Sequence, residues 1–276
     1  MRIRLGHSAD PDDAFMFWGL ASGTVDARGF EFEQVVSDIQ TLNEWAQEGR
    51  LEVTAISVAA YPLVQDRYVL LPHGASFGSG YGPVVVGRKR FSRDELREVE
   101  IAVPGENTTA FLVLKMALGG PFACRPMPFD RILDDVRSGE CEAGLLIHEG
   151  QLTFESSGLE KSLDLGEWWL LETGLPLPLG VNVARRDLGD DTLRELSDVL
   201  LESIEAGLAH RDQARQYAMQ FARGLDDETA DRFIDMYVND LTCSYGEEGR
   251  QAVEELLRRA ESIGAYEEPV RVEFVE

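Results

Sequence analysis

Short apolar runs alternate with helical patterns through the first two-thirds of this sequence, and this alternation constrains the fold more than any other feature. The runs Phe30–Val36 and Val53–Ile56 have the length and composition of buried strands. Between them, Ile39–Gln47 has helical periodicity, and Ser37 or Asp38 would cap its start. Strands that alternate with helices predict an α/β fold with a parallel or mixed sheet.

A second, smaller α/β unit is expected from about Arg88 onward. Three further runs have strand character there, namely Glu100–Val103, Phe122–Pro128 and Gly144–Ile147, and helical patterns separate them. The segment Gly174–Gly180 follows. Its two prolines fix φ and interrupt any helix, which is typical of a hinge strand that brings the chain back. After this return the periodicity is almost entirely helical.

Such a chain builds half of one lobe, all of a second, and then returns to the first. The larger lobe would hold residues 1–88 and 183–276, the smaller lobe residues 89–182, and hinge strands would lie near residues 88–90 and 180–184. This connectivity places a cleft between the lobes, and clefts at domain junctions are favoured ligand sites. The alternative is one continuous doubly wound domain followed by a helical appendage.

Composition excludes several functional classes. The net charge is −24, from 26 basic and 50 acidic residues, and a field of this sign repels phosphate backbones, so no nucleic-acid partner is expected. An acidic substrate would need local donors such as helix N-termini. The 3 cysteines have neither a disulfide pattern nor zinc spacing, and we expect no metal. No membrane-spanning run or signal sequence is visible, so we expect a cytoplasmic protein with no membrane partner.

The segment Ala143–Thr153 contains a candidate catalytic residue. Its apolar run ends abruptly in His148 and Glu149, as expected of a buried strand whose carboxyl end opens on a ligand crevice. Histidine has an unperturbed pKa close to working pH, so His148 is a candidate general base held on a rigid element. The alternative is a histidine whose ring is satisfied by a backbone carbonyl at a strand edge.

A candidate anion site lies at Gly105–Ala110, between a predicted strand and a predicted helix. Backbone N–H groups at a helix start, together with the hydroxyls of Thr108 and Thr109, are suited to a carboxylate. The alternative is a plain threonine N-cap.

Three more polar segments would face the same crevice. The loop Ser8–Asp13 puts three carboxylates at a helix start; capping explains one or two of them, and the rest indicate hydrogen bonds to substrate hydroxyls or, less favoured, a divalent metal. Ser57 ends the third strand and is either a substrate contact or an N-cap. In the turn Ser79–Pro83 the glycines permit close backbone approach and Tyr81 offers a stacking face, unless this is only a turn between domains.

No GxxxxGK[ST], GxGxxG or GxSxG fingerprint occurs, so P-loop, dinucleotide-binding and α/β-hydrolase interpretations have no support. The chain instead resembles the 1,4-dihydroxy-6-naphthoate synthases of the futalosine menaquinone pathway, within the periplasmic-binding-protein-like superfamily. The resemblance extends from Arg2 to about Leu188 and is carried by Asp38–Asn43, Val53–Thr54 with Ser57, Gly80–Pro83, Thr108–Ala110, Ile147–Gly150 and Leu175–Gly180. It implies a two-lobed fold of the periplasmic-binding-protein-like type II class, with an interlobe cleft and a helical C-terminal part.

The resemblance also implies a reaction. A carbon–carbon lyase would convert cyclic dehypoxanthine futalosine, a small carboxylated substrate, to 1,4-dihydroxy-6-naphthoate with no cofactor; the resemblance implies nothing about the oligomeric state. His148 would act as general base, and the threonine pair would hold the substrate carboxylate. The substrate-binding residues expected are Ser57, Thr108, Thr109, Asp13, Asp38 and Tyr81.

Two departures from the family pattern concern the substrate. The first loop, commonly of the Ser-Pro-Cys-Pro-Asn-Asp type, reads Ser-Ala-Asp-Pro-Asp-Asp over Ser8–Asp13, and Ala55 and Ala59 stand where the family often has a lysine and a histidine. The alternatives are a chorismate dehydratase-like sibling, a paralogue with a changed substrate, and a non-catalytic solute-binding protein of the same fold. The absence of a signal sequence argues against a receptor, and Ile147–Gly150 favours the synthase. Glu149 is a weak candidate for orienting the imidazole, because neighbours on an extended strand point to opposite faces.

Overall fold

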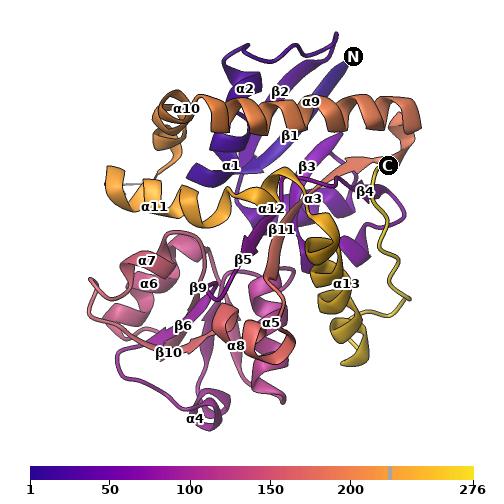
Figure 1. Cartoon of the computed structure of the whole chain (residues 1–276). Coiled ribbons are helices and arrows are strands. Elements are labelled where there is room, and N and C mark those ends of the chain that lie inside the picture. Colours follow the sequence, from indigo (N-terminus) through magenta and orange to yellow (C-terminus); the bar gives the residue numbers. More distant parts are fainter. Residues whose placement is uncertain (223–225) are drawn as a thin grey trace.

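Two sheets, each covered by helices, form the two lobes of the molecule (Figure 1). The computed structural model describes residues 1–222 and 226–276. The strands of the first sheet are, in spatial order, β2 (Glu31–Ser37), β1 (Arg2–Ser8), β3 (Val53–Ser57), β11 (Leu177–Arg185) and β4 (Tyr68–Leu70), with β5 (Ser76–Gly78) paired to β11 beside them. β1 runs parallel to β2 and β3, whereas β11 is antiparallel to β3, β4 and β5, so the sheet is mixed.

The second sheet is also mixed. Its strands are, in spatial order, β10 (Glu160–Asp164), β6 (Val84–Gly87), β9 (Ala143–Leu146), β7 (Ile101–Val103) and β8 (Cys124–Pro126). β9 pairs parallel with β7 and antiparallel with β6. The existence of two separate sheets excludes the alternative of one continuous doubly wound domain.

The chain crosses between the lobes before β6 and again along β11. β6 belongs to the second sheet because Val84 pairs with Leu146 of β9 and with Asp164 of β10. The first crossing therefore lies ahead of Val84, which corrects the hinge expected at residues 88–90 and the lobe boundary expected at residue 88. β5 and β11 lie side by side, with Leu177 opposite Gly78. The correction arises because the strand partners of β6 come from distant segments, which a local pattern does not reveal.

Helices cover both sheets and fill most of the C-terminal part. The first lobe has α1 (Pro11–Met16), α2 (Trp18–Ala21), α3 (Ile39–Gln47) and the 3-10 turn η1 (Val58–Leu63). The second has α4 (Arg93–Glu98), α5 (Thr109–Leu118), α6 (Phe129–Ser138), α7 (Gly150–Thr153) and α8 (Leu165–Thr173). After β11 follow η2 (Arg186–Leu188), α9 (Asp190–Ala209), α10 (Arg211–Ala218), η3 (Met219–Phe221), α11 (Asp227–Tyr237), α12 (Asp240–Cys243) and α13 (Gly246–Ser262). In Figure 1, α9 crosses the first lobe and α11 lies where the two lobes meet.

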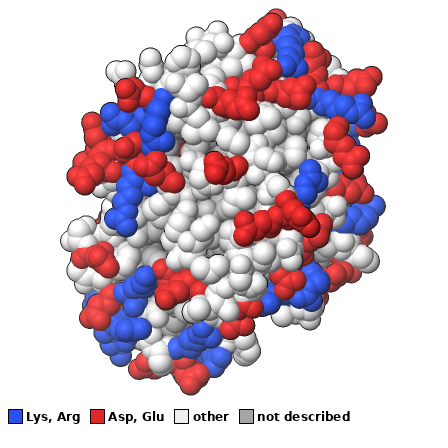
Figure 2. All heavy atoms as spheres, in the orientation of Figure 1, with Lys and Arg blue, Asp and Glu red and all other residues white. Residues whose placement is uncertain are grey.

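The largest apolar cluster continues from one lobe into the other. It includes Ile56 of the first sheet, Val85 of the second, Trp169 of α8 and Leu256 of α13, all of them almost fully buried. Burial of apolar surface is the main stabilising contribution to such packing, at about 25 cal/mol per Å². Outside the core, acidic side chains are scattered over the visible surface among fewer basic ones (Figure 2). Within the described residues, no helix combines the length and the apolar character needed to cross a membrane.

Candidate active site

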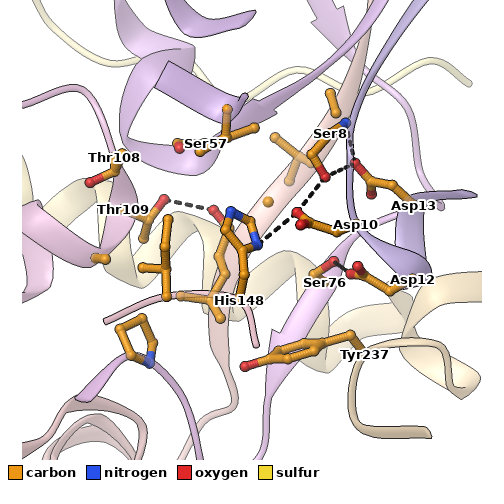
Figure 3. A pocket seen from close by; sticks show the side chains of 18 of the residues that line it. Ser8, Asp10, Asp12, Asp13, Ser57, Ser76, Thr108, Thr109, His148 and Tyr237 are labelled. Carbon is orange, nitrogen blue, oxygen red and sulfur yellow. Dashed lines mark hydrogen bonds and ion pairs between the residues drawn. The ribbon is translucent and has the colours of Figure 1, made fainter. Parts of the chain in front are cut away.

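A cavity of about 90 Å³ lies between the lobes. The first lobe contributes the ends of β1 and β3, the start of α1, and residues of β5 and β11, while the second contributes the N-terminus of α5 and the turn after β9. Polar and charged side chains line much of the cavity, among them Ser8, Asp10, Asp12, Asp13, Ser57 and His148 (Figure 3). The cavity thus lies at strand ends and helix starts, where the backbone and side chains present polar groups to a ligand.

His148 projects into this cavity from the turn that follows β9. Its backbone φ is +52°, in the left-handed region that costs a non-glycine residue roughly 1–2 kcal/mol. Its Nδ1 lies 2.7 Å from Oδ2 of Asp10. Its Nε2 is buried and has no hydrogen-bond partner within the described part of the chain. The partner of the ring is thus a carboxylate and not a backbone carbonyl, and one nitrogen remains for a ligand (Figure 3).

Two opposing effects set the protonation of His148. Burial lowers its pKa, but the negative charge of Asp10 and the hydrogen bond to Asp10 outweigh this and raise the pKa to about 9. The charges of Glu149 and Asp12 act in the same direction as Asp10, with smaller effects. The imidazole is therefore a stronger base than free histidine.

The loop before α1 surrounds Asp10 with further buried carboxyls. Ser8 Oγ lies 2.7 Å from Oδ2 of Asp10 and 2.7 Å from Oδ2 of Asp13. Asp12 accepts a hydrogen bond from Ser76 Oγ at 3.2 Å. Burial, together with the charges of Asp13 and Asp10, raises the pKa of Asp12 well above its usual range, and burial also raises that of Asp13. Among the described residues no group of three or more histidine, cysteine or acidic side chains could hold a metal ion.

The threonine pair lines the cavity, but both hydroxyls are engaged within the protein. Thr108 is the N-cap of α5: its Oγ1 accepts from the N–H of Phe111 at 3.2 Å and donates to the carbonyl of Gly105 at 2.8 Å. Thr109 Oγ1 donates to the carbonyl of Leu179 at 2.7 Å and accepts from the N–H of Ala59 at 3.2 Å.

What remains for an anion at the start of α5 is its backbone. The N–H groups of Thr109 and Ala110 have no acceptor among the contacts of the described residues. Both residues line the cavity. Free N–H groups at a helix N-terminus favour a negatively charged ligand. The start of α5 therefore offers backbone N–H groups to the cavity, and the threonine hydroxyls hold this helix start in place.

Ser57 lies at the carboxyl end of β3 and lines the cavity. Its Oγ accepts from Nδ2 of Asn43 at 3.1 Å, and its N–H donates to Oδ1 of the same side chain at 2.8 Å. The amide of Asn43 therefore fixes the rotamer and leaves the serine proton for a ligand. Ala55 also lines the cavity, whereas Ala59 is buried and is not among the lining residues.

Two residues expected to contact substrate lie outside this cavity. Asp38 is the N-cap of α3, where its carboxylate accepts from the N–H of Thr41 at 3.0 Å. Tyr81 points to the C-terminal end of α11, where its hydroxyl donates to the carbonyl of Met236. Neither Asp38 nor Tyr81 is among the residues that line the cavity. Asp38 therefore has a structural role as a helix cap, and Tyr81 has a structural role in joining the segment before β6 to α11.

Two further groups in the site have no local signal in the sequence. With the Gln151 amide oriented to satisfy both its ends, its nitrogen donates to the carbonyl of Gly82 at 2.6 Å and to the hydroxyl of Tyr237 at 2.7 Å, and its oxygen accepts from the N–H of His148 at 3.1 Å. Gln151 follows β9 and Tyr237 ends α11, so this contact joins the second lobe to the C-terminal helices. Burial raises the pKa of Tyr237, which keeps its phenol a neutral hydrogen-bonding group.

Comparison with known proteins gives one family and one fold. The sequence matches the menaquinone biosynthesis family over residues 3–262. Two curated relatives are named 1,4-dihydroxy-6-naphthoate synthase: that of Thermus thermophilus is 43% identical and covers 99% of each chain, and that of Streptomyces coelicolor is 38% identical and covers 95% of this chain and 94% of the relative.

Solved structures extend this similarity to the whole fold. A crystal structure of a protein from Archaeoglobus fulgidus superposes with a TM-score of 0.92 at 47% identity, covering 96% of this chain and 98% of the other. A Candida albicans protein described as having the generic periplasmic-binding-protein fold gives a TM-score of 0.74 at 13% identity, covering 98% of this chain and 92% of the other. The expected two-lobed periplasmic-binding-protein-like fold is therefore confirmed.

Proposed function

Because the chain belongs to the menaquinone biosynthesis family, we propose that it is the enzyme of that pathway that converts cyclic dehypoxanthine futalosine to 1,4-dihydroxy-6-naphthoate by breaking a carbon–carbon bond. The names of its relatives at 43% and 38% identity support this product. The observation that carries a chemical role, as opposed to binding alone, is the pair formed by His148 and Asp10, with Nδ1 and Oδ2 2.7 Å apart inside the cavity.

His148 is the general base in this proposal. Its Nδ1–H donates to Asp10, which fixes the tautomer and leaves Nε2, which has no hydrogen-bond partner among the described residues, to act on the substrate. Nε2 takes a proton from a carbon of the substrate. The electron pair of the broken C–H bond starts the fragmentation that leaves the aromatic bicycle and releases the sugar-derived part as a small three-carbon product. A positioned base contributes typically ~10²–10⁴-fold to such a step.

The remaining rate enhancement comes from orientation. The substrate carboxylate is held by the free N–H groups at the start of α5, to which Thr109 and Ala110 belong. Ser57 donates its remaining proton from the opposite lobe, since Asn43 already holds its oxygen. Groups on both lobes therefore fix the substrate relative to Nε2, and fixed geometry of this kind replaces a large entropic cost of reaction.

The test is turnover by the purified full-length protein. Incubation with cyclic dehypoxanthine futalosine is expected to give 1,4-dihydroxy-6-naphthoate, detected by its absorbance and by mass spectrometry. Chorismate, the substrate of the sibling dehydratase, is offered in parallel and is expected to remain unchanged. Binding of the first compound without turnover would instead support a solute-binding protein. Turnover of the second alone would assign the dehydratase reaction.

A further inference from the structure

One hydroxyl proton of Ser8 serves two carboxyl groups. Ser8 Oγ lies 2.7 Å from Oδ2 of Asp10 and 2.7 Å from Oδ2 of Asp13, and its N–H donates to the latter oxygen at 2.8 Å. A serine hydroxyl donates a single proton, and an ionised carboxylate can only accept. With both aspartates ionised, one of the two contacts would set lone pairs against each other. One carboxyl of this pair must therefore carry a proton.

We propose that Asp13 holds this proton and that Ser8 is a positioning residue for the base. Asp13 donates to Ser8 Oγ, and Ser8 in turn donates to Oδ2 of Asp10. The same Asp10 oxygen accepts from Nδ1 of His148 at 2.7 Å (Figure 3). The direction follows from the imidazole: Oδ2 of Asp10 accepts from Nδ1–H, and this short contact is strongest when Asp10 is the ionised member of the pair. Four side chains thus form one directed relay.

Burial supports this assignment. Ser8, Asp10 and Asp13 are 5%, 2% and 8% exposed, so little water is available to replace a missing proton donor. Desolvation disfavours the charged form of a carboxyl, and this effect raises the pKa of Asp13. Asp10 is in direct contact with the imidazole of His148, whereas the ring nitrogens of His7, whose charge favours the ionised form of Asp13, contact the Ser8 carbonyl and Gln34 instead.

The relay lowers the basicity of His148. The catalytic consequence of this effect rests on the proposed function of His148 as the general base. The hydrogen bond from Ser8 stabilises the charge of Asp10 and so weakens its pull on the imidazolium. A neutral Asp13 keeps a second negative charge away from the ring. Both effects keep the pKa of His148 lower than it would be beside two ionised aspartates. At a given pH, a larger fraction of the enzyme therefore has an unprotonated Nε2.

The proton balance of the step is simple. A substrate C–H bond breaks, an N–H bond forms at Nε2 of His148, and the C–H electron pair stays with the substrate. His148 becomes an imidazolium paired with ionised Asp10, while Ser8 and Asp13 keep their protons. No proton leaves the relay in this step.

The experiment is a titration of His148 in the substrate-free protein, followed by NMR of its ring nitrogens. Asp10→Asn removes the paired charge and is expected to lower the pKa of His148 by more than about one unit. Asp13→Asn replaces one neutral group by another and is expected to shift it by less than about half a unit. Ser8→Ala is expected to raise it by roughly half to one unit, and Ser8→Thr, which keeps the hydroxyl, to restore it.

Ser76→Ala is the matched control, since it removes another cavity hydroxyl, one that donates to Asp12 at 3.2 Å and lies outside the relay. It is expected to move the pKa of His148 less than Ser8→Ala does. A drop of a full unit or more in Asp13→Asn would mean that Asp13 is ionised and would overturn the proposal. An unchanged value in a folded Ser8→Ala protein would also overturn it. Because the Asp13→Asn result stands alone, the proposal remains testable if Ser8→Ala does not fold.

The titration uses no substrate, so its outcome is independent of the proposed reaction. If cyclic dehypoxanthine futalosine is not turned over, the proposed function fails while the relay is still tested. If it is turned over, the acid limb of kcat/KM should follow the pKa of His148 from variant to variant. A limb that stays in place while the pKa moves would remove His148 as the base and leave the relay intact.

Discussion

Nδ1 of His148 and Oδ2 of Asp10 lie 2.7 Å apart, although His148 follows β9 of the second lobe and Asp10 precedes α1 of the first. The contact therefore spans the cleft. Any separation of the lobes would part the imidazole from its carboxylate and remove the interaction that raises its pKa. In the proposed mechanism, the closure that surrounds a ligand therefore also brings Asp10 to the base.

Replacement of His148 by asparagine tests the base directly. Asparagine keeps comparable size and some hydrogen bonding but cannot take up a proton. We expect kcat to fall at least about 10²-fold while substrate still binds. His210→Asn is the matched control, because His210 packs against Trp18, with ring centroids 5.5 Å apart, and does not line the cavity. Near wild-type turnover in His148→Asn would leave the histidine a structural role only.

The pH profile should have an acid limb set by His148. A general base must be unprotonated in the free enzyme, and its pKa is raised to about 9. We therefore expect kcat/KM to rise as the pH rises toward about 9, by up to tenfold per pH unit below it. Steady-state rates between about pH 6 and pH 10 measure this. A profile that is flat across this range would contradict a proton-accepting role.

Replacing Thr108 and Thr109 by valine should weaken binding through the geometry of α5. Thr108 would lose its cap, which costs about 1 kcal/mol of stability. Thr109 would lose the contacts to Leu179 and Ala59 that join α5 to the hinge and the first lobe. We expect a lower melting temperature and a higher Kd, with Thr108→Ser close to wild type. An unchanged Kd together with a lower melting temperature would restrict the pair to folding.

The buried His73 should make stability depend on acid pH. Desolvation is the main cause that lowers its pKa from 6.5 to about 4, and its Nε2 lies 2.9 Å from Ser197 Oγ. Because the folded pKa is depressed, stability is fully present above pH 6.5 and declines as the pH falls toward 4. The loss is of the order of 3 kcal/mol.

Denaturant unfolding of the wild type and His73→Gln between these two pH values measures the effect as a difference. In the variant, the free energy of unfolding is expected to change less with pH, because the contribution of His73 to this dependence is missing. His148 has the opposite sign, because its pKa is raised: its contribution is fully present below pH 6.5 and is lost as the pH rises from there through about 9. Parallel slopes in the two proteins would show that His73 is not the group responsible.

Secondary-structure elements that depend on residues close together in the sequence could be predicted from the sequence. The helix Ile39–Gln47 begins and ends where its periodicity and the cap at Ser37 or Asp38 placed it. Helical periodicity depends on residues three and four apart, and a cap on residues two or three apart, so these signals are fully contained in short windows. The position of His148 after an apolar strand belongs to the same class of information.

Only the tertiary structure decided which groups meet. Asp10 was visible as one of three carboxylates in a loop, but its pairing with His148 joins two lobes. The sheet of β6 and the role of Tyr81 likewise depended on partners far away in the chain. The pairing of distant segments is set by the total burial and hydrogen bonding of the folded chain, and no short window contains that sum. Local sequence therefore determined the elements and the candidate side chain His148, and tertiary packing determined the carboxylate that raises its pKa.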